Sequence, residues 1–125
     1  MITLTLPLAP SVNRLWRIAG KRMIKSAEYK AWLDEAGWMI KQQTRQTIDG
    51  QYAIHIRAQR VNRRRDLDNI LKATSDLLVS MKVVEDDSQC VALAAEWAKE
   101  STAPMIVTLI PMEPDDEDRN QQILQ

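Results

Sequence analysis

The sequence predicts a two-layer α/β domain in which two helices pack on one side of a mixed sheet. Three observations carry this prediction: short stretches of alternating apolar residues, two longer stretches with apolar residues at helical spacing, and their order β-α-β-α-β-β. A length of 125 residues with 45% hydrophobic residues fits one globular domain with a single hydrophobic core. We therefore expect one domain over residues 1–112 and a mobile acidic tail over residues 113–125.

The N-terminal part is expected to hold a strand, a basic loop and the first helix. Ile2 to Leu6 alternates apolar residues with threonine, as a half-buried strand does. A basic stretch follows, in which Gly20-Lys21 is the tip of a hairpin. Ser26 then caps a helix over about residues 27–47, and one face of that helix gathers Trp32, Ala36, Met39, Ile40 and Gln43.

The remaining elements follow from the same two periodicities. Asp49-Gly50 is expected to stop the first helix, and apolar residues then alternate between residues 52 and 58 as in a second strand. A clear apolar stripe predicts a second helix from about Asn69 to Met81. Two more strands are expected, one along residues 91–97 and one along residues 105–110.

The composition excludes several classes of protein. Cys90 is the only cysteine and His55 the only histidine, so a disulfide scaffold and a structural zinc site are both excluded. No apolar run approaches the roughly 20 residues of a membrane helix. The first eight residues lack the features of a signal peptide, so we expect a cytoplasmic protein.

The net charge of zero conceals an asymmetry along the chain. The last 13 residues hold five of the 17 acidic residues and one of the 17 basic ones, so residues 1–112 carry a net charge of +4. A basic body with an acidic tail is compatible with a polyanionic partner such as nucleic acid.

One stretch of the sequence gathers charges of both signs beside the second helix. The arginine run Arg63–Arg65 stands directly before Asp66 and Asp68. Residues two apart in an extended segment point to the same side, so we expect both carboxylates to share a face. Asp68 would then precede the helix, and Lys72 would follow one turn later.

A second acidic cluster, at residues 85–87, is expected to return to the same place. The helix over residues 69–81 is about 20 Å long at 1.5 Å per residue, and the six residues after it span about 20 Å if they are extended. A reversal after Met81 therefore brings Asp87 level with the start of the helix. Neighbours in an extended chain face opposite ways, so Asp86 and Asp87 do not both face inward.

Three converging carboxylates without a Cys or His partner suit a hard cation. We expect Mg²⁺, with Mn²⁺ able to replace it. The surrounding arginines suit phosphate, which they bind through paired hydrogen bonds. These features together predict metal-assisted hydrolysis of a phosphodiester, in which Lys72 stabilises charge on the phosphate or the departing oxygen.

Simpler interpretations of the same residues stay open. Asp68 is a good helix N-cap, Asp66 can neutralise the neighbouring arginines, and Asp86-Asp87 fits an ordinary turn. The main alternative function is a non-catalytic protein that binds branched DNA. A phosphohydrolase of a small nucleotide is disfavoured, because the chain has three glycines and no glycine-rich phosphate loop.

The ordered set of motifs resembles the RusA family of Holliday junction endonucleases, which is mainly phage-derived. The matching pieces are Arg65-Asp66-Leu67-Asp68-Asn69, Lys72, Asp76, Asp86-Asp87-Ser88-Gln89 and, near the start, Pro10-Ser11-Val12-Asn13-Arg14. The likeness spans roughly residues 2–111. Val12 departs from the family, which usually has asparagine there.

This resemblance implies a homodimer that binds four-way DNA junctions and cuts two strands symmetrically with Mg²⁺ or Mn²⁺. It assigns metal binding to Asp66, Asp68 and Asp87, and an essential role to Lys72. We expect DNA contacts from basic residues of the N-terminal loop and the arginine run: Arg14, Lys21, Arg22, Arg63, Arg64 and Arg65.

Overall fold

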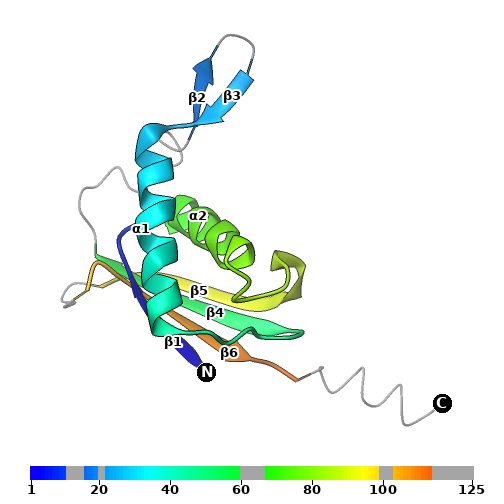
Figure 1. Cartoon of the computed structure of the whole chain (residues 1–125). Helices are drawn as coiled ribbons and strands as arrows, with labels where there is room; N and C mark the ends of the chain where they lie inside the picture. Colours follow the sequence, from blue (N-terminus) through cyan, green and yellow to red (C-terminus); the bar gives the residue numbers. More distant parts are fainter. Residues whose placement is uncertain (11–15, 20–21, 60–66, 99–102, 114–125) are drawn as a thin grey trace.

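The computed structural model describes residues 1–10, 16–19, 22–59, 67–98 and 103–113. Its elements are β1 (Ile2–Leu6), β2 (Trp16–Ala19), β3 (Arg22–Lys25), α1 (Ala27–Gln43), β4 (Tyr52–Gln59), α2 (Leu67–Ser80), the 3₁₀ helix η2 (Asp87–Gln89), β5 (Cys90–Ala98) and β6 (Met105–Pro111). Both helices lie on one side of a four-stranded sheet, and the β2–β3 hairpin projects beyond the N-terminal end of α1 (Figure 1). The predicted α/β fold is confirmed.

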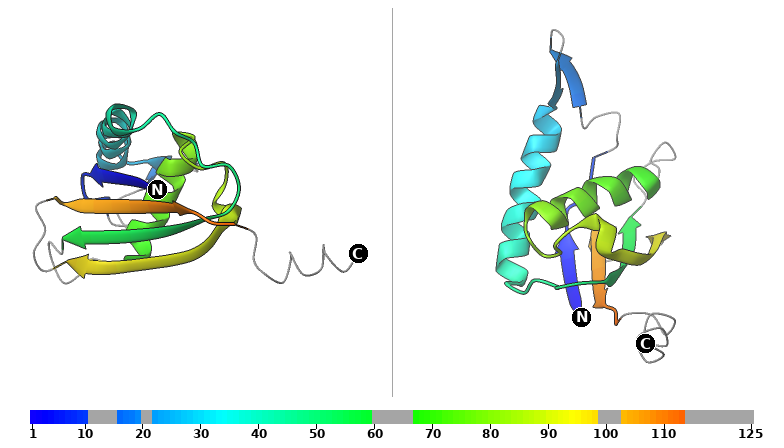
Figure 2. Two further views of the ribbon diagram at one scale, coloured as in Figure 1. Left: turned by 90° about the horizontal axis from the view of Figure 1, so that it is seen from below. Right: turned by 90° about the vertical axis from the view of Figure 1, so that its right-hand side faces the viewer.

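The sheet has the strand order β1-β6-β4-β5. β6 pairs antiparallel with both β1 and β4, whereas β4 and β5 are parallel. A parallel pair needs a crossover connection, and α2 provides it on the same side of the sheet as α1 (Figure 2). α2 thereby packs beside η2 and β5.

The core lies between the sheet and the two helices. Along β4, buried side chains alternate with more exposed ones, as the sequence pattern predicts for a strand with one covered face. In register, Ile54 of β4 stands beside Leu93 of β5 and Leu109 of β6. The largest fully buried side chains are Tyr52, Leu4, Leu6, Ile40, Ile56, Ile70, Leu77, Leu78, Met105, Leu109, Val83 and Val84.

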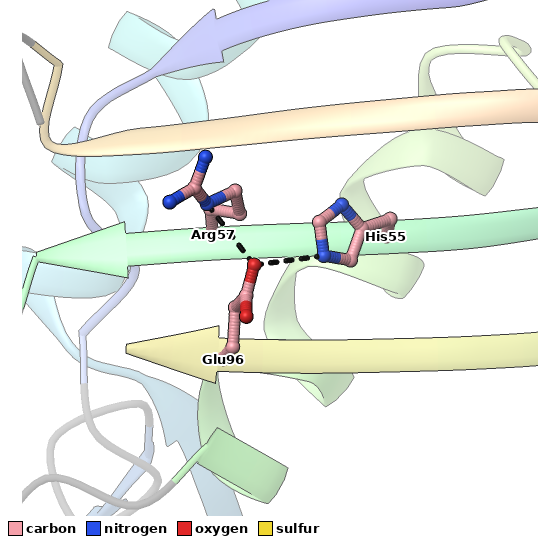
Figure 3. A network of polar contacts seen from close by, with 3 residues as sticks. All are labelled: His55, Arg57 and Glu96. Atoms are coloured by element: carbon pink, nitrogen blue, oxygen red, sulfur yellow. Dashed lines mark ion pairs between the residues drawn. The ribbon is translucent and has the colours of Figure 1, made fainter. Parts of the chain in front are cut away.

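The other face of the sheet carries a small charged network (Figure 3). One Glu96 oxygen, Oε1, lies 3.2 Å from His55 Nε2 and 3.0 Å from Arg57 Nε. About half of each of the Glu96 and Arg57 side chains is exposed, so solvent screens the attraction and the pairs add little stability. His55 follows Ile54 on the strand and therefore points away from the helices.

α1 begins where the sequence predicts and ends earlier. The Ser26 hydroxyl accepts a hydrogen bond from the Tyr29 backbone N–H at 3.1 Å, which confirms the N-cap. The helix ends at Gln43, not near Thr47 at the Asp49-Gly50 turn. Thr44 is already extended, with φ −151° and ψ 150°. The expected end was wrong because the next residues pair with the turn that follows α2, a tertiary contact.

Gln43 links the end of α1 to the edge of the sheet. Its side-chain amide donates to the Thr5 carbonyl, and its side-chain oxygen accepts from the Thr5 N–H, both at 2.7 Å. The Gln43 side chain thus satisfies both the N–H and the carbonyl of Thr5 on the edge strand β1. The sequence places Gln43 on the core face of α1, and the structure shows it exposed at the rim of that face.

The tryptophans divide between core and surface. Trp32 is buried, and its indole N–H donates to the Pro7 carbonyl at 3.0 Å. Trp38, by contrast, is 61% exposed. It lies two residues beyond the buried Ala36, which turns it about 200° around the helix.

α2 buries the stripe that predicts it, including Ile70, Ala73, Leu77 and Leu78. It begins at Leu67, two residues before the expected start, and ends at Ser80. Of the helices in the described part of the chain, none is long and apolar enough to cross a membrane.

Candidate active site

A cleft of about 360 Å³ lies between α2, η2 and the first half of β5. We call it the acidic cleft, because three of its lining residues are aspartates. Its lining residues are Ile54, Asp68, Leu71, Lys72, Ser75, Asp76, Asp87, Cys90 and Leu93. Apolar side chains of the sheet and the helix therefore form one wall, and charged side chains form the rim.

α2 supplies the cationic residue and two of the acidic residues. Asp68, Lys72 and Asp76 are four residues apart in turn, which places them along one side of the helix. All three are exposed. Asp68 lies in the first turn of α2, so its expected position just before the helix was wrong, and the helix places it one turn from Lys72 as predicted.

The chain reversal after α2 brings Asp87 to the same cleft. Lys82 adopts the left-handed region, with φ 59°, directly after the helix. Val83 and Val84 are buried, which anchors the returning segment under α2. Asp87 then opens η2 and lines the same cleft as Asp68 and Lys72. The expected chain reversal after Met81 is therefore present.

Asp86 and Asp87 have different surroundings although they are adjacent. Asp87 lines the cleft, whereas Asp86 is not among its lining residues. The Asp86 carboxylate accepts a hydrogen bond from the Ser88 hydroxyl at 2.6 Å. That hydrogen bond is the main reason why the pKa of Asp86 lies below its usual value. Of the two, only Asp87 lines the acidic cleft, as expected for neighbours that do not both face inward.

Tyr52 is a buried phenol close to this acidic turn. It starts β4 directly beside Cys90, which starts β5. Burial is the main cause that raises the pKa of Tyr52 to about 12, and electrostatic interactions with Cys90, Asp87 and Asp86 add to it. The phenol therefore stays neutral under physiological conditions.

The donor set of the cleft suits a hard cation, although the described residues supply only part of it. Asp68 and Asp87 offer carboxylate oxygens from two sides, which is the ligand type that Mg²⁺ prefers. Within the described ranges, no three His, Cys, Asp or Glu side chains gather closely enough to hold a metal ion. Asp66, the third expected ligand, lies outside those ranges.

The expected DNA-binding residues fall mostly outside the described residues. Arg22 begins β3, which pairs with β2 from Trp16 to Ala19, so the expected hairpin is confirmed although its tip is not described. The expected DNA-binding residues that lie outside the described ranges are Arg14, Lys21, Arg63, Arg64 and Arg65.

Sequence reasoning named Asp76 only through the family motif and gave it no role, and it missed the cleft positions of Ser75, Leu93 and Cys90. The four-residue spacing from Asp68 through Lys72 to Asp76 is the signal that was available for Asp76. No local signal exists for Leu93, because its place depends on the register between β4 and β5. Cys90 is half-buried at the start of β5, as a small residue in a strand is expected to be.

Comparison with known families agrees with the motifs from which the resemblance was drawn. Comparison with curated proteins finds no match to the chain. The family model described as Endodeoxyribonuclease RusA matches residues 6–110, a span that starts at the end of β1 and ends within β6. That span contains every residue of the acidic cleft. A match over most of the chain, with the fold and the cleft inside it, means that this chain belongs to the RusA family of endodeoxyribonucleases.

Proposed function

We propose that this chain is a metal-dependent endonuclease that resolves four-way DNA junctions by paired, symmetric cleavage. The observation that carries the proposal is the meeting of Asp68, Lys72 and Asp87 in one cleft, inside the span of the endodeoxyribonuclease family match. These residues come from two separate motifs of the sequence, so their convergence is a property of the fold.

The acidic cleft offers the groups that phosphodiester hydrolysis needs. Asp68 and Asp87, with Asp66, would hold Mg²⁺ or Mn²⁺. When bound, that ion would lower the pKa of a water ligand and offset charge on the phosphate. Lys72 places a fixed positive charge on the same rim, where it stabilises the charge that develops on the phosphate or the departing oxygen.

A nuclease assay tests the proposal directly. The protein is mixed with a mobile four-way junction, a linear duplex and a single strand of the same sequences, with Mg²⁺, with Mn²⁺ and with EDTA. We expect paired cuts in the junction only, and only with a divalent cation. Cutting of all three substrates at similar rates would contradict junction specificity, and cutting in EDTA would contradict the role of the metal.

The non-catalytic alternative predicts a different result from the same assay. A protein that binds the junction tightly but leaves it intact with every cation would support it. Paired cuts at a rate that depends on Mg²⁺ would exclude it.

We propose a homodimer as the active form. A two-fold dimer presents two equivalent active sites to two symmetry-related strands, which paired cleavage requires. We expect light scattering at micromolar concentration to give twice the mass of one chain. A monomer with full cutting activity under the same conditions would contradict the dimer.

A further inference from the structure

A second and larger cleft, of about 460 Å³, lies at the other end of α2. It is open to solvent between the C-terminal end of α1, the segment after it and the turn after α2. Ile40, Met81 and Val83 contribute apolar lining, and Lys41, Arg45 and Lys82 contribute three positive charges. None of the described residues that line it is acidic. We call it the basic cleft.

The three cations of the basic cleft are not held in ion pairs by acidic side chains of the described residues. Within the part of the chain that the structure describes, none of them forms an ion pair, whereas Arg57 on the far face of the sheet pairs with Glu96. All three side chains are exposed. Unneutralised cations grouped in a concave, open surface attract anions more strongly than the same charges scattered over a convex one.

The cleft is built by specific contacts and is not an accident of a loose loop. The Thr47 hydroxyl donates to the Lys82 carbonyl at 2.7 Å, and the Ile48 N–H donates to the Val83 carbonyl at 2.8 Å. The backbone of Lys82 has φ 59°, a left-handed conformation that residues other than Gly and Asn rarely adopt. Glycine would adopt this backbone conformation with less strain, whereas the lysine adds a positive charge to the cleft.

Helix dipoles account for only part of this charge. α1 and α2 both end here, and each C-terminus carries about half a negative charge. Lys41 lies in the last turn of α1 and is well placed to offset one of them. Three full positive charges nevertheless exceed two half charges, so the cleft keeps a surplus of about two positive charges.

We propose that the basic cleft binds the phosphate backbone of a DNA arm, at a distance from the cleavage chemistry. The inference rests on the proposed junction-cutting function and names a second contact for the same substrate. Asp68 in the acidic cleft and Met81 in the basic cleft lie 13 residues apart, which is about 20 Å along the helix axis. Successive phosphates of one strand advance about 3.4 Å along the duplex axis, so the contact falls about six base pairs from the cut.

The arm length of the substrate gives a sharp test. We compare the wild type with Arg45→Gln, Lys82→Asn and the double variant, on junctions with arms of about four and about 15 base pairs. Ca²⁺ replaces Mg²⁺ so that binding is measured without cutting. Asn tolerates a positive φ, so Lys82→Asn removes the charge and keeps the turn. Arg57→Gln makes the same chemical change as Arg45→Gln on the far face of the sheet and serves as the control.

We expect the double variant to bind the long-armed junction about tenfold more weakly and the short-armed junction as the wild type does. The slope of log affinity against log salt should fall by about two on long arms, because two phosphate contacts are lost. Arg57→Gln should change neither. Equal losses on both substrates, or an equal loss in the control, would overturn the proposal, and so would wild-type binding of long arms by the double variant.

The same proteins separate this inference from the proposed function. If the wild type cuts junctions but the double variant binds long arms normally, only the second contact fails. If the wild type cuts no DNA, the nuclease proposal fails, while a loss of binding restricted to long arms still supports a DNA contact at the basic cleft.

Discussion

The two ends of α2 differ in charge and in construction. At its N-terminal end, the acidic cleft brings Asp68 and Asp87 together beside one lysine. At its C-terminal end, the basic cleft gathers three cations and no acid. A carboxylate pair attracts a divalent cation and repels phosphate, whereas the basic cleft attracts phosphate and offers nothing to a metal. The comparison suggests that one rigid helix separates the site of the reaction from a site that holds the substrate.

Loss of a carboxylate should separate the two ends most clearly. Asp87→Asn replaces an oxygen ligand of the cleft by a neutral amide, so we expect cutting of the junction to fall to background. Binding should stay equal or become tighter, because a negative charge near phosphate is removed. Asp68→Asn and Asp66→Asn should behave alike. The measurements are the cleavage rate with Mg²⁺ and the junction affinity with Ca²⁺.

The neighbouring residue provides the matched control for this experiment. Asp86→Asn removes the same charge as Asp87→Asn, but at the adjacent position, which does not line the cleft. Asp86→Asn should therefore cut at close to the normal rate. A loss in Asp86→Asn as large as that in Asp87→Asn would mean that the charge of the turn matters and that the cleft position does not.

The acidic cleft could be predicted from the sequence because its geometry follows from short-range rules. The apolar stripe places the helix, and the helix places Asp68 and Lys72 on one side. The return of Asp87 follows from the lengths of two segments. What remained beyond prediction was the contribution of the sheet, since the place of Leu93 depends on which strand pairs with β4 and in which register.

The basic cleft could not be predicted for a related reason. Residues 42–47 are all polar and contain no glycine or proline, so the sequence carries no strong stop signal before Asp49-Gly50. The helix ends at Gln43, where the Thr44 hydroxyl accepts a hydrogen bond from the Gln46 N–H at 3.1 Å and Ile48 pairs with the turn after α2. The long-range pairing brings Arg45 into the same cleft as Lys82. The acidic cleft thus depends mainly on residues close together in the sequence, whereas the basic cleft depends on a contact between residues far apart in it.

The second largest effect is expected at Lys72, the one cation among the described residues that line the acidic cleft. Lys72→Ala should lower the turnover of bound junction by about a hundredfold, as loss of a charge-stabilising donor does in other enzymes, and should barely change affinity. Single-turnover rates at saturating protein, set beside binding with Ca²⁺, give the two quantities. Arg45→Gln should show the opposite pattern, with weaker binding and normal turnover once saturated. Equal and small losses of both quantities in Lys72→Ala would make it an ordinary phosphate contact.

A smaller effect is expected on stability at alkaline pH, through the phenol beside the acidic turn. The pKa of Tyr52 is about 12 in the folded protein and near 10 in an unfolded chain. Above pH 10 the unfolded state therefore loses this proton while the folded state keeps it, and unfolding becomes easier. The free energy of unfolding should fall by up to about 1.4 kcal/mol per pH unit between pH 10 and 12 from this group alone.

Tyr52→Phe isolates that contribution from the other groups that titrate at high pH. The difference in free energy of unfolding between wild type and variant should be constant below pH 10 and should shift against the wild type above it. Urea titrations at pH 8, 10 and 11 provide the values. A difference that stays constant through pH 11 would show that the phenol titrates normally in the folded protein.

The smallest effect is expected from the acidic tail, which bears on how freely the basic surfaces meet DNA. Five carboxylates lie between residues 113 and 118, and residues 114–125 are outside the described part of the chain. Negative charges tethered to a basic body compete with DNA for its cations, most of all with linear duplex, which binds by charge alone. Truncation after Met112 should tighten duplex binding by about two- to fivefold at low salt, and the gain should fade as salt screens the charges. Equal affinity of the full-length and truncated proteins across a salt titration would mean that the tail is only a solubilising end. If the gain in duplex binding occurs only in proteins with an intact Arg45 and Lys82, the tail competes with DNA at the basic cleft.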